Sequence, residues 1–114
     1  MAKKKPALAP SLPSTPPRIH EAILGKGGAI IKGKALTQAE AETMRKAGQD
    51  VVVAGENLSA NRSLAGAIEK RANVKTKRCP PHPSAGKNAL PHYQPDPRPP
   101  EGHTFYETPK RKAL

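Results

Sequence analysis

The sequence predicts one small α+β domain with two helices, a short sheet and a long irregular segment rich in proline. Its 114 residues allow a single domain of this kind. Two stretches carry helix start and stop signals, and a short run with strand character follows each of them. Residues 79–107 hold eight of the fourteen prolines. Because each proline removes a backbone donor, we expect neither a long helix nor a central strand there.

The chain opens with a leader and a glycine-rich break. Residues 1–17 are rich in Lys, Pro, Ala and Ser, which predicts a disordered leader and places the domain proper at residues 18–114. Residues 18–24 predict a short helical turn that ends at Gly25, and residues 29–31 predict a short strand or a turn.

The first helix has the clearest start in the chain. Thr37 followed by Glu40 is the pattern of a capping box, in which the threonine oxygen and the glutamate each satisfy a backbone donor of the other. Basic residues lie in the last turn, where they complement the helix dipole, and Gly48 can take the left-handed conformation that ends a helix. We therefore predict a helix over residues 37–47.

A run of three valines, residues 51–53, predicts a short buried strand because it is apolar on both faces. A second helix follows, capped by Asn57 or Ser59 and extending to about residue 72. Its apolar stripe consists of Leu64, Ile68 and Ala72. Its solvent side is expected to carry Arg62, Glu69, Lys70 and Arg71.

Two further strands complete the predicted fold. Residues 74–79 alternate loosely and predict an edge strand, and residues 103–107 predict a short, aromatic last strand. The edge strand carries three cations in a basic strip beside the proline-rich segment. We predict that this strip binds nucleic acid through Lys75, Lys77 and Arg78.

The charge of the chain indicates an anionic partner. Twenty Lys and Arg residues against nine Asp and Glu residues give a net charge of +11, which nucleic acid, an acidic protein or a membrane surface would neutralise. No apolar run approaches the ~20 residues that cross a bilayer, and prolines interrupt the start of the chain, so a signal peptide is not expected. One cysteine, Cys79, allows neither an internal disulfide nor a cysteine-based zinc site.

Histidines mark the proline-rich segment as a candidate catalytic site. Metal-free cleavage of RNA needs a general base, a general acid and a cation beside the phosphate. We assign the acid and base to His92 and His103, with His82 in reserve. Arg98 and Lys87 are the expected phosphate ligands. Either Tyr106 or Glu107 is expected to orient one imidazole.

Other uses of the same residues stay open. The three histidines with Asp96 could bind a divalent ion, although their separations fit no standard ligand spacing. The three aromatic residues could instead stack on bases without any catalysis, and each histidine could simply hydrogen-bond a backbone carbonyl. The glycines show no dinucleotide-binding pattern, and neither a cofactor nor a bound metal is expected.

A resemblance in general pattern extends over roughly residues 36–112. It rests on the stretch PHPSAGKNALPHYQPDPRPPEGHTFYE and on the preceding AGQDVVVAGENLSANRSLAGAIEKRA. Both are similar to the C-terminal tips of bacterial polymorphic toxins of the Rhs, PAAR-linked or contact-dependent kind. The resemblance implies a small basic nuclease, a larger parent protein that delivers it into a neighbouring cell, and an acidic immunity protein that neutralises it. No catalytic motif of the well-described toxin nucleases matches, so the site residues rest on their chemistry alone.

We therefore expect an antibacterial toxin domain, secreted or injected, that cleaves nucleic acid in the cytoplasm of the target cell, with RNA favoured over DNA. Three alternatives remain from other classes: a metal-dependent DNase, a toxin that transfers ADP-ribose from nicotinamide dinucleotide, and a binding module without catalysis. Cleavage of RNA, cleavage of DNA, dependence on the dinucleotide, and salt-sensitive binding without cleavage distinguish the four.

Overall fold

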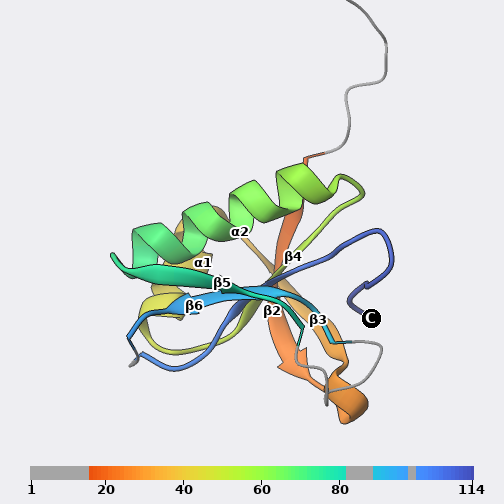
Figure 1. Ribbon diagram of the computed structural model, residues 1–114, viewed down its shortest axis with the longest axis horizontal. Helices are drawn as coiled ribbons and strands as arrows, with labels where there is room; N and C mark the ends of the chain where they lie inside the picture. Colours follow the sequence, from red (N-terminus) through yellow and green to blue (C-terminus); the bar gives the residue numbers. More distant parts are fainter. Residues whose placement is uncertain (1–15, 82–88, 98–99) are drawn as a thin grey trace, which may run out of the picture.

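The computed structural model describes residues 16–81, 89–97 and 100–114. Within them the chain forms a six-stranded mixed sheet with two α-helices, which confirms the predicted α+β class (Figure 1). The strand order is β3-β2-β4-β7-β6-β5. The leader expected over residues 1–17 falls almost wholly outside the described residues, as do His82, Lys87 and Arg98. No helix of the described part is long and apolar enough to cross a membrane.

A twisted hairpin opens the fold. It consists of β2 (Arg18–Leu24) and β3 (Ile30–Leu36), joined by a 3-10 turn at Lys26–Gly28. The helical turn expected over residues 18–24 is wrong, because β2 pairs antiparallel with β3 on one side and with β4 on the other. Pairing with strands distant in sequence overrides the weak local preference of so short a segment.

Helix α1 (Gln38–Lys46) begins as predicted. The Thr37 hydroxyl accepts a hydrogen bond from the Glu40 backbone at 3.1 Å, and the Glu40 carboxylate accepts one from the Thr37 backbone at 2.8 Å. That backbone donor holds the pKa of Glu40 below its ordinary value, since it favours the ionised carboxylate. Gly48 has a φ of +82° just after the helix, which confirms its predicted role as the terminating residue.

The predicted buried strand and second helix are both confirmed as β4 (Val51–Ala54) and α2 (Leu58–Ala72). Asn57 caps α2 by accepting a hydrogen bond from the Ala60 backbone at 2.9 Å. The helix buries Ile68 as expected, but the expectation that Glu69 faces solvent is wrong. Glu69 is fully buried because Arg45 of α1 lies opposite it and supplies the charge that a buried carboxylate requires.

The last three strands are β5 (Thr76–Cys79), β6 (His92–Pro95) and β7 (Thr104–Tyr106). β5 lies at the edge of the sheet, as predicted. β6 corrects the expectation of a wholly irregular proline-rich segment, because it pairs with β5 on one side and β7 on the other. Its prolines allow this arrangement, since Pro95 ends the strand and Pro91 precedes it, so three consecutive residues keep their backbone donors. β7 is a central strand that runs parallel to β4.

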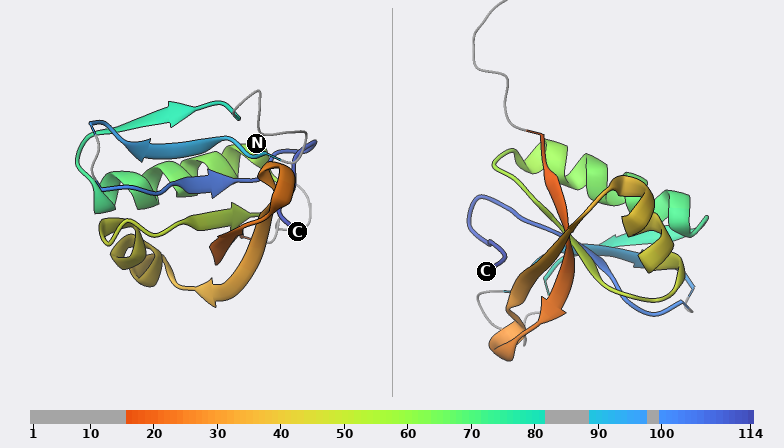
Figure 2. Two further views of the ribbon diagram at one scale, coloured as in Figure 1. Left: turned by 90° about the horizontal axis from the view of Figure 1, so that it is seen from below. Right: turned by 180° about the vertical axis from the view of Figure 1, so that it is seen from behind.

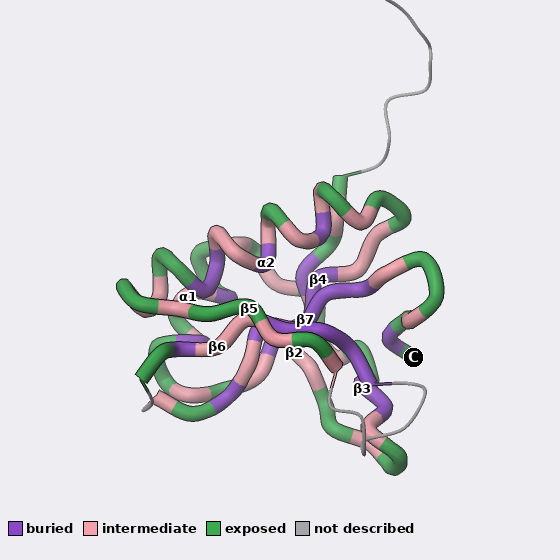
Figure 3. Tube along the Cα trace, in the orientation of Figure 1, coloured by how far each residue is buried: buried purple, intermediate pink, exposed green. Residues whose placement is uncertain are grey.

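Each face of the sheet has its own small core. Both helices cover one face, which we call the helix face (Figure 2). Its buried residues are Ile19, Ala41, Val51, Val53, Ala65, Ile68 and Tyr106. The opposite face buries Ile30, Val52, Leu90, Phe105 and Ala113. Figure 3 shows buried positions concentrated on β4 and β7, with exposed positions toward the hairpin tip and β5.

A C-terminal segment, residues 107–114, runs across the face opposite the helices and adds to its core through Ala113. The Leu114 backbone donates to the Ile30 carbonyl at 2.7 Å, and the Lys32 backbone donates to the Leu114 carbonyl at 3.0 Å. These bonds continue the sheet pattern beyond β3. The segment that follows β7 is therefore tied to the β2–β3 hairpin, which forms the end of the sheet opposite β5.

Candidate functional site

The strand register brings the predicted histidines onto one face of the sheet. His92 on β6 lies opposite Phe105 on β7, and Phe105 lies beside Val52 on β4. Since side chains alternate between faces, His103 projects on the same side as Phe105, away from the helices. We call this side the histidine face.

His92 and His103 are in direct contact. Their ring centroids are 4.6 Å apart, and the ring planes meet at 75°. The Phe105 ring supports both imidazoles, with centroid separations of 5.5 Å to His92 and 5.1 Å to His103. Eleven residues of sequence separate the two histidines, and the antiparallel pairing of β6 with β7 removes that separation in space.

Asp50 is a site residue that the sequence reasoning missed. One oxygen of its carboxylate lies 2.8 Å from the His103 backbone nitrogen and 3.1 Å from Nδ1 of the His103 ring. An ionised carboxylate only accepts hydrogen bonds, so Nδ1 carries the proton and Nε2 becomes the ring atom able to accept one. Asp50 thus fixes both the orientation and the tautomer of His103.

The contact between Asp50 and His103 follows from the parallel pairing of two strands. Asp50 comes directly before β4 and His103 directly before β7, and the Val51 backbone donates to the His103 carbonyl at 3.1 Å. Residues that precede neighbouring parallel strands meet at the same edge of a sheet. Asp50 directly before the predicted valine strand and His103 as the first residue of the predicted last strand are the sequence signals that could have suggested this pair.

The two imidazoles line a cavity of about 250 Å³ on the histidine face. His92 is 1% exposed, whereas the His103 side chain is 24% exposed, so His103 is the more accessible of the pair. The other walls are apolar or backbone: Leu24, Gly25, Gly28, Ala29, Ile30, Ala89, Leu90 and Phe105. Within the described part of the chain, the walls therefore include no lysine or arginine.

Tyr106 and Glu107 take part in other contacts. Tyr106 is buried in the core of the helix face, where its ring centroid lies 5.8 Å from that of Tyr93. The Glu107 carboxylate accepts hydrogen bonds from the Gly55 backbone at 3.0 Å and from the Ala113 backbone at 2.8 Å. The carboxylate that pairs with His103 is that of Asp50.

The predicted basic strip lies on exposed positions of the edge strand and the residue before it. Lys75, Lys77 and Arg78 are all exposed. Lys77 lies opposite Gln94, which shares a face with His92, whereas Arg78 lies opposite Tyr93 of the helix face. The strip is therefore divided between the two faces, with Lys77 on the histidine face and Arg78 on the helix face.

The described part of the chain offers no preformed metal centre. No group of three or more His, Cys, Asp or Glu side chains within residues 16–81, 89–97 and 100–114 is arranged to hold an ion. His82, the third histidine of the predicted metal alternative, lies outside these residues, as do the predicted phosphate ligands Arg98 and Lys87. Cys79 carries a free, half-buried thiol opposite His92.

Comparisons with known proteins found no relative of this chain. The chain matches no protein-family model, no curated protein and no solved structure.

Proposed function

We propose that this domain is a toxin-type ribonuclease that cleaves RNA without a metal ion, using His92 and His103 as its acid and base. The observation that carries the proposal is the contact of two imidazoles, 4.6 Å apart, beside a cavity, with one of them held by Asp50. The net charge of +11 supports an anionic substrate.

His103 is the proposed base. Its Nε2 takes the proton of a ribose 2′-hydroxyl, the 2′-oxygen bonds to phosphorus, and Asp50 stabilises the imidazolium that forms. His92 is the proposed acid, which gives its proton to the departing 5′-oxygen as the phosphorus–oxygen bond breaks. The products are a 2′,3′-cyclic phosphate and a 5′-hydroxyl.

The short distance between the two imidazole rings suits these two proton transfers. Two imidazolium charges at this separation repel each other strongly in a partly buried site. In the proposed reaction one ring gains a proton as the other loses one, so the pair carries a single positive charge throughout. The apolar walls of the cavity suit a nucleobase, whose flat face is contacted by apolar and aromatic side chains in RNA-binding proteins.

The proposal extends to partners and place of action. A basic toxin domain of this kind would be carried by a larger parent protein, act in the cytoplasm of the target cell, and be neutralised by an acidic immunity protein. The charge of +11 supports such an acidic partner as well as RNA.

The activity is tested by incubating the purified domain with total RNA and with plasmid DNA, each with and without EDTA. We expect loss of RNA that persists in EDTA. Loss of DNA that EDTA abolishes would replace the proposal with metal-dependent DNA cleavage. Intact RNA and DNA under all conditions would exclude nuclease activity and leave nucleotide- or protein-directed chemistry.

The residues are tested by the variants His103→Ala and His92→Ala, each measured for RNA cleavage, toxicity in cells and unfolding by denaturant. Loss of a general acid or base lowers the rate by roughly 10²–10⁴-fold. Lys46→Ala, at an exposed position on α1, serves as the control for a surface substitution. Full activity in both histidine variants would contradict the assignment. If His103→Ala loses activity but unfolds at the same denaturant concentration as the wild type, the loss comes from the site and not from unfolding.

A further inference from the structure

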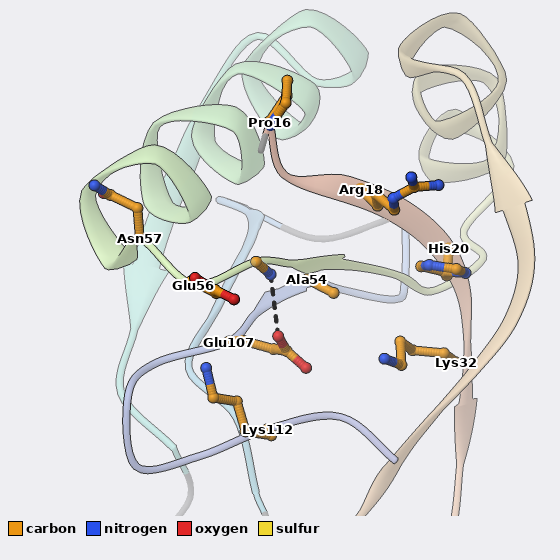
Figure 4. Close-up of a pocket in the computed structure, with 10 residues that line it drawn as sticks. Pro16, Arg18, His20, Lys32, Ala54, Glu56, Asn57, Glu107 and Lys112 are labelled. Atoms are coloured by element: carbon orange, nitrogen blue, oxygen red, sulfur yellow. Dashed lines mark hydrogen bonds between the residues drawn. The ribbon is translucent and has the colours of Figure 1, made fainter. Parts of the chain in front are cut away.

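The histidine face has a second hollow, of about 320 Å³, near the other end of β4. Figure 4 shows the basic side chains that line it, which come from different segments. Arg18 and His20 come from β2, Lys32 from β3 and Lys112 from the C-terminal segment. We call these four residues the cationic pocket.

Three full positive charges around one hollow need an explanation. Arg18, Lys32 and Lys112 are exposed, and among the described residues none of them forms an ion pair. Like charges brought together repel, so the arrangement is stabilised when an anion lies between them. Two carboxylates, those of Glu56 and Glu107, also border the hollow, and both oxygens of Glu107 already accept backbone hydrogen bonds. Three cations against two carboxylates still leave an excess of one positive charge around the hollow.

The pocket is held in place by backbone hydrogen bonds. The Ala113 backbone donates to Glu107 at 2.8 Å, and Leu114 exchanges hydrogen bonds with the strand that carries Lys32. Nδ1 of His20 lies 3.1 Å from the Gly33 carbonyl, which only accepts, so Nδ1 is the donor and Nε2 is the other ring position. A site assembled before its ligand arrives loses less entropy on binding.

The register relates this pocket to the histidine pair. His20 lies opposite Val52, Val52 opposite Phe105, and Phe105 opposite His92, in one row across the sheet. Three strand spacings separate His20 from His92, or roughly 14 Å. One flexible single strand of RNA can therefore contact both places on the same face.

We propose that the cationic pocket binds a phosphate of the RNA strand at a distance from the cleaved bond. The inference rests on the proposed function and makes it specific: the substrate is a strand of several nucleotides. A dinucleotide at the histidine pair cannot reach the cationic pocket, whereas a longer strand occupies both.

The test uses the full chain with His103→Ala, so that RNA binds without being cleaved, and compares a dinucleotide with a single strand of about twelve nucleotides by fluorescence anisotropy. In that background the pocket variant is Lys32→Gln with Lys112→Gln. The matched control is Lys46→Gln with Lys70→Gln, which removes the same charge from exposed positions on α1 and α2.

We expect the pocket variant to bind the long strand at least tenfold more weakly. The slope of log affinity against log salt concentration should become shallower by about 0.7 for each phosphate that the variant no longer neutralises. Binding of the dinucleotide should stay within a factor of two or so of the starting protein, since a uniform loss of charge acts weakly at a distance in salt. The control variant should behave like the starting protein with both ligands.

Four results overturn the inference, and they differ from one another. If the pocket and control variants weaken binding of the long strand equally, the effect comes from the net charge of the protein and not from the pocket. Equal weakening for dinucleotide and long strand would place the pocket at the cleaved phosphate itself. If His103→Ala binds neither ligand and the wild-type chain cleaves no RNA, the proposed function fails together with this inference. If the wild-type chain cleaves RNA but the pocket variant binds the long strand as tightly as His103→Ala alone, only the inference fails.

Discussion

Strand β7 has a polar cluster on each side, and the two clusters are built differently. On the helix face, Thr104 donates to Glu69 at 2.9 Å, and Glu69 pairs with Arg45 at 2.7 Å with both side chains fully buried. On the histidine face, the neighbouring residue His103 contacts Asp50 and His92 beside a cavity. One residue step along the chain separates the two arrangements, because His103 directly precedes Thr104.

The difference lies in what surrounds each charge. Glu69 accepts from Arg45, Thr104 and Asn73, and Arg45 also donates to the carbonyls of Gln49 and Glu101. The Arg45 and Glu69 side chains at the centre of this network are closed to solvent. The network ties both helices to the loop before β7, which is a structural role. His103 is partly exposed and faces a cavity, so its ring can meet a substrate.

Breaking the closed network should have the largest effect. Arg45→Met leaves the Glu69 carboxylate buried without its cation, and we expect a loss of about 3–5 kcal/mol in the free energy of unfolding. Denaturant unfolding measures it. The double variant Arg45→Met with Glu69→Leu should lose less than the single one, because it buries no unpaired charge. A single variant as stable as the wild type would contradict a structural role for the pair.

The second largest effect is expected at Gly102, the residue directly before His103. Gly102 has a φ of +90°, and a Cβ there would lie 2.5 Å from the Arg45 guanidinium and 2.7 Å from the Gly48 carbonyl. Gly102→Ala should cost about 1–3 kcal/mol from backbone strain alone, with the collision in addition. Gly27→Ala is the matched control, since φ is +65° there and nothing lies within 4 Å. If thermal unfolding shows that Gly102→Ala and Gly27→Ala lose the same stability, the collision of the new Cβ with Arg45 and Gly48 costs no stability.

On the histidine face, Asp50→Asn should act on the reaction more than on the fold. The amide can still accept from the His103 backbone, but it no longer stabilises the imidazolium formed at that ring. We expect kcat to fall roughly tenfold to hundredfold with KM nearly unchanged and with an altered pH profile. Glu42→Gln removes a carboxylate that pairs with Arg71 at the surface and is the control. A change in KM alone would assign Asp50 to binding.

The smallest effect is expected at the capping box of α1, whose hydrogen bonds are exposed. The pKa of Glu40 is lowered in the folded state, so its contribution to stability is present above the ordinary pKa and is lost as the pH falls through the folded pKa. Thermal unfolding of Glu40→Gln should therefore differ most from the wild type near neutral pH and converge with it in acid. A difference that stays constant with pH would show that ionisation of Glu40 does not matter.

Much of the secondary structure could be predicted from the sequence because its causes are local. The capping box of Thr37 and Glu40, the helix stop at Gly48, the valine strand and the cap at Asn57 all act within a few residues. The errors fall where distant pairing decides. Residues 18–24 became a strand through β4, and β6 formed within the proline-rich segment through β5 and β7.

The candidate site divides in the same way. Residue chemistry alone singled out His92 and His103, since imidazole is suited to proton transfer near neutral pH. Asp50 could not be assigned without the parallel pairing of β4 with β7, because 53 residues separate it from His103. The cationic pocket was missed for the same reason, as its residues come from β2, β3 and the C-terminal segment.

The charge of the protein, its two helices and the kind of chemistry open to its histidines follow from the amino-acid sequence, since these depend on composition and on neighbours along the chain. Which residues meet depends on the tertiary structure. Strand order and register placed His103 against His92 and Asp50 on one face, and Glu69 against Arg45 on the other. Such contacts join residues distant in the chain, and they form only when the burial of both cores stabilises one arrangement of the sheet.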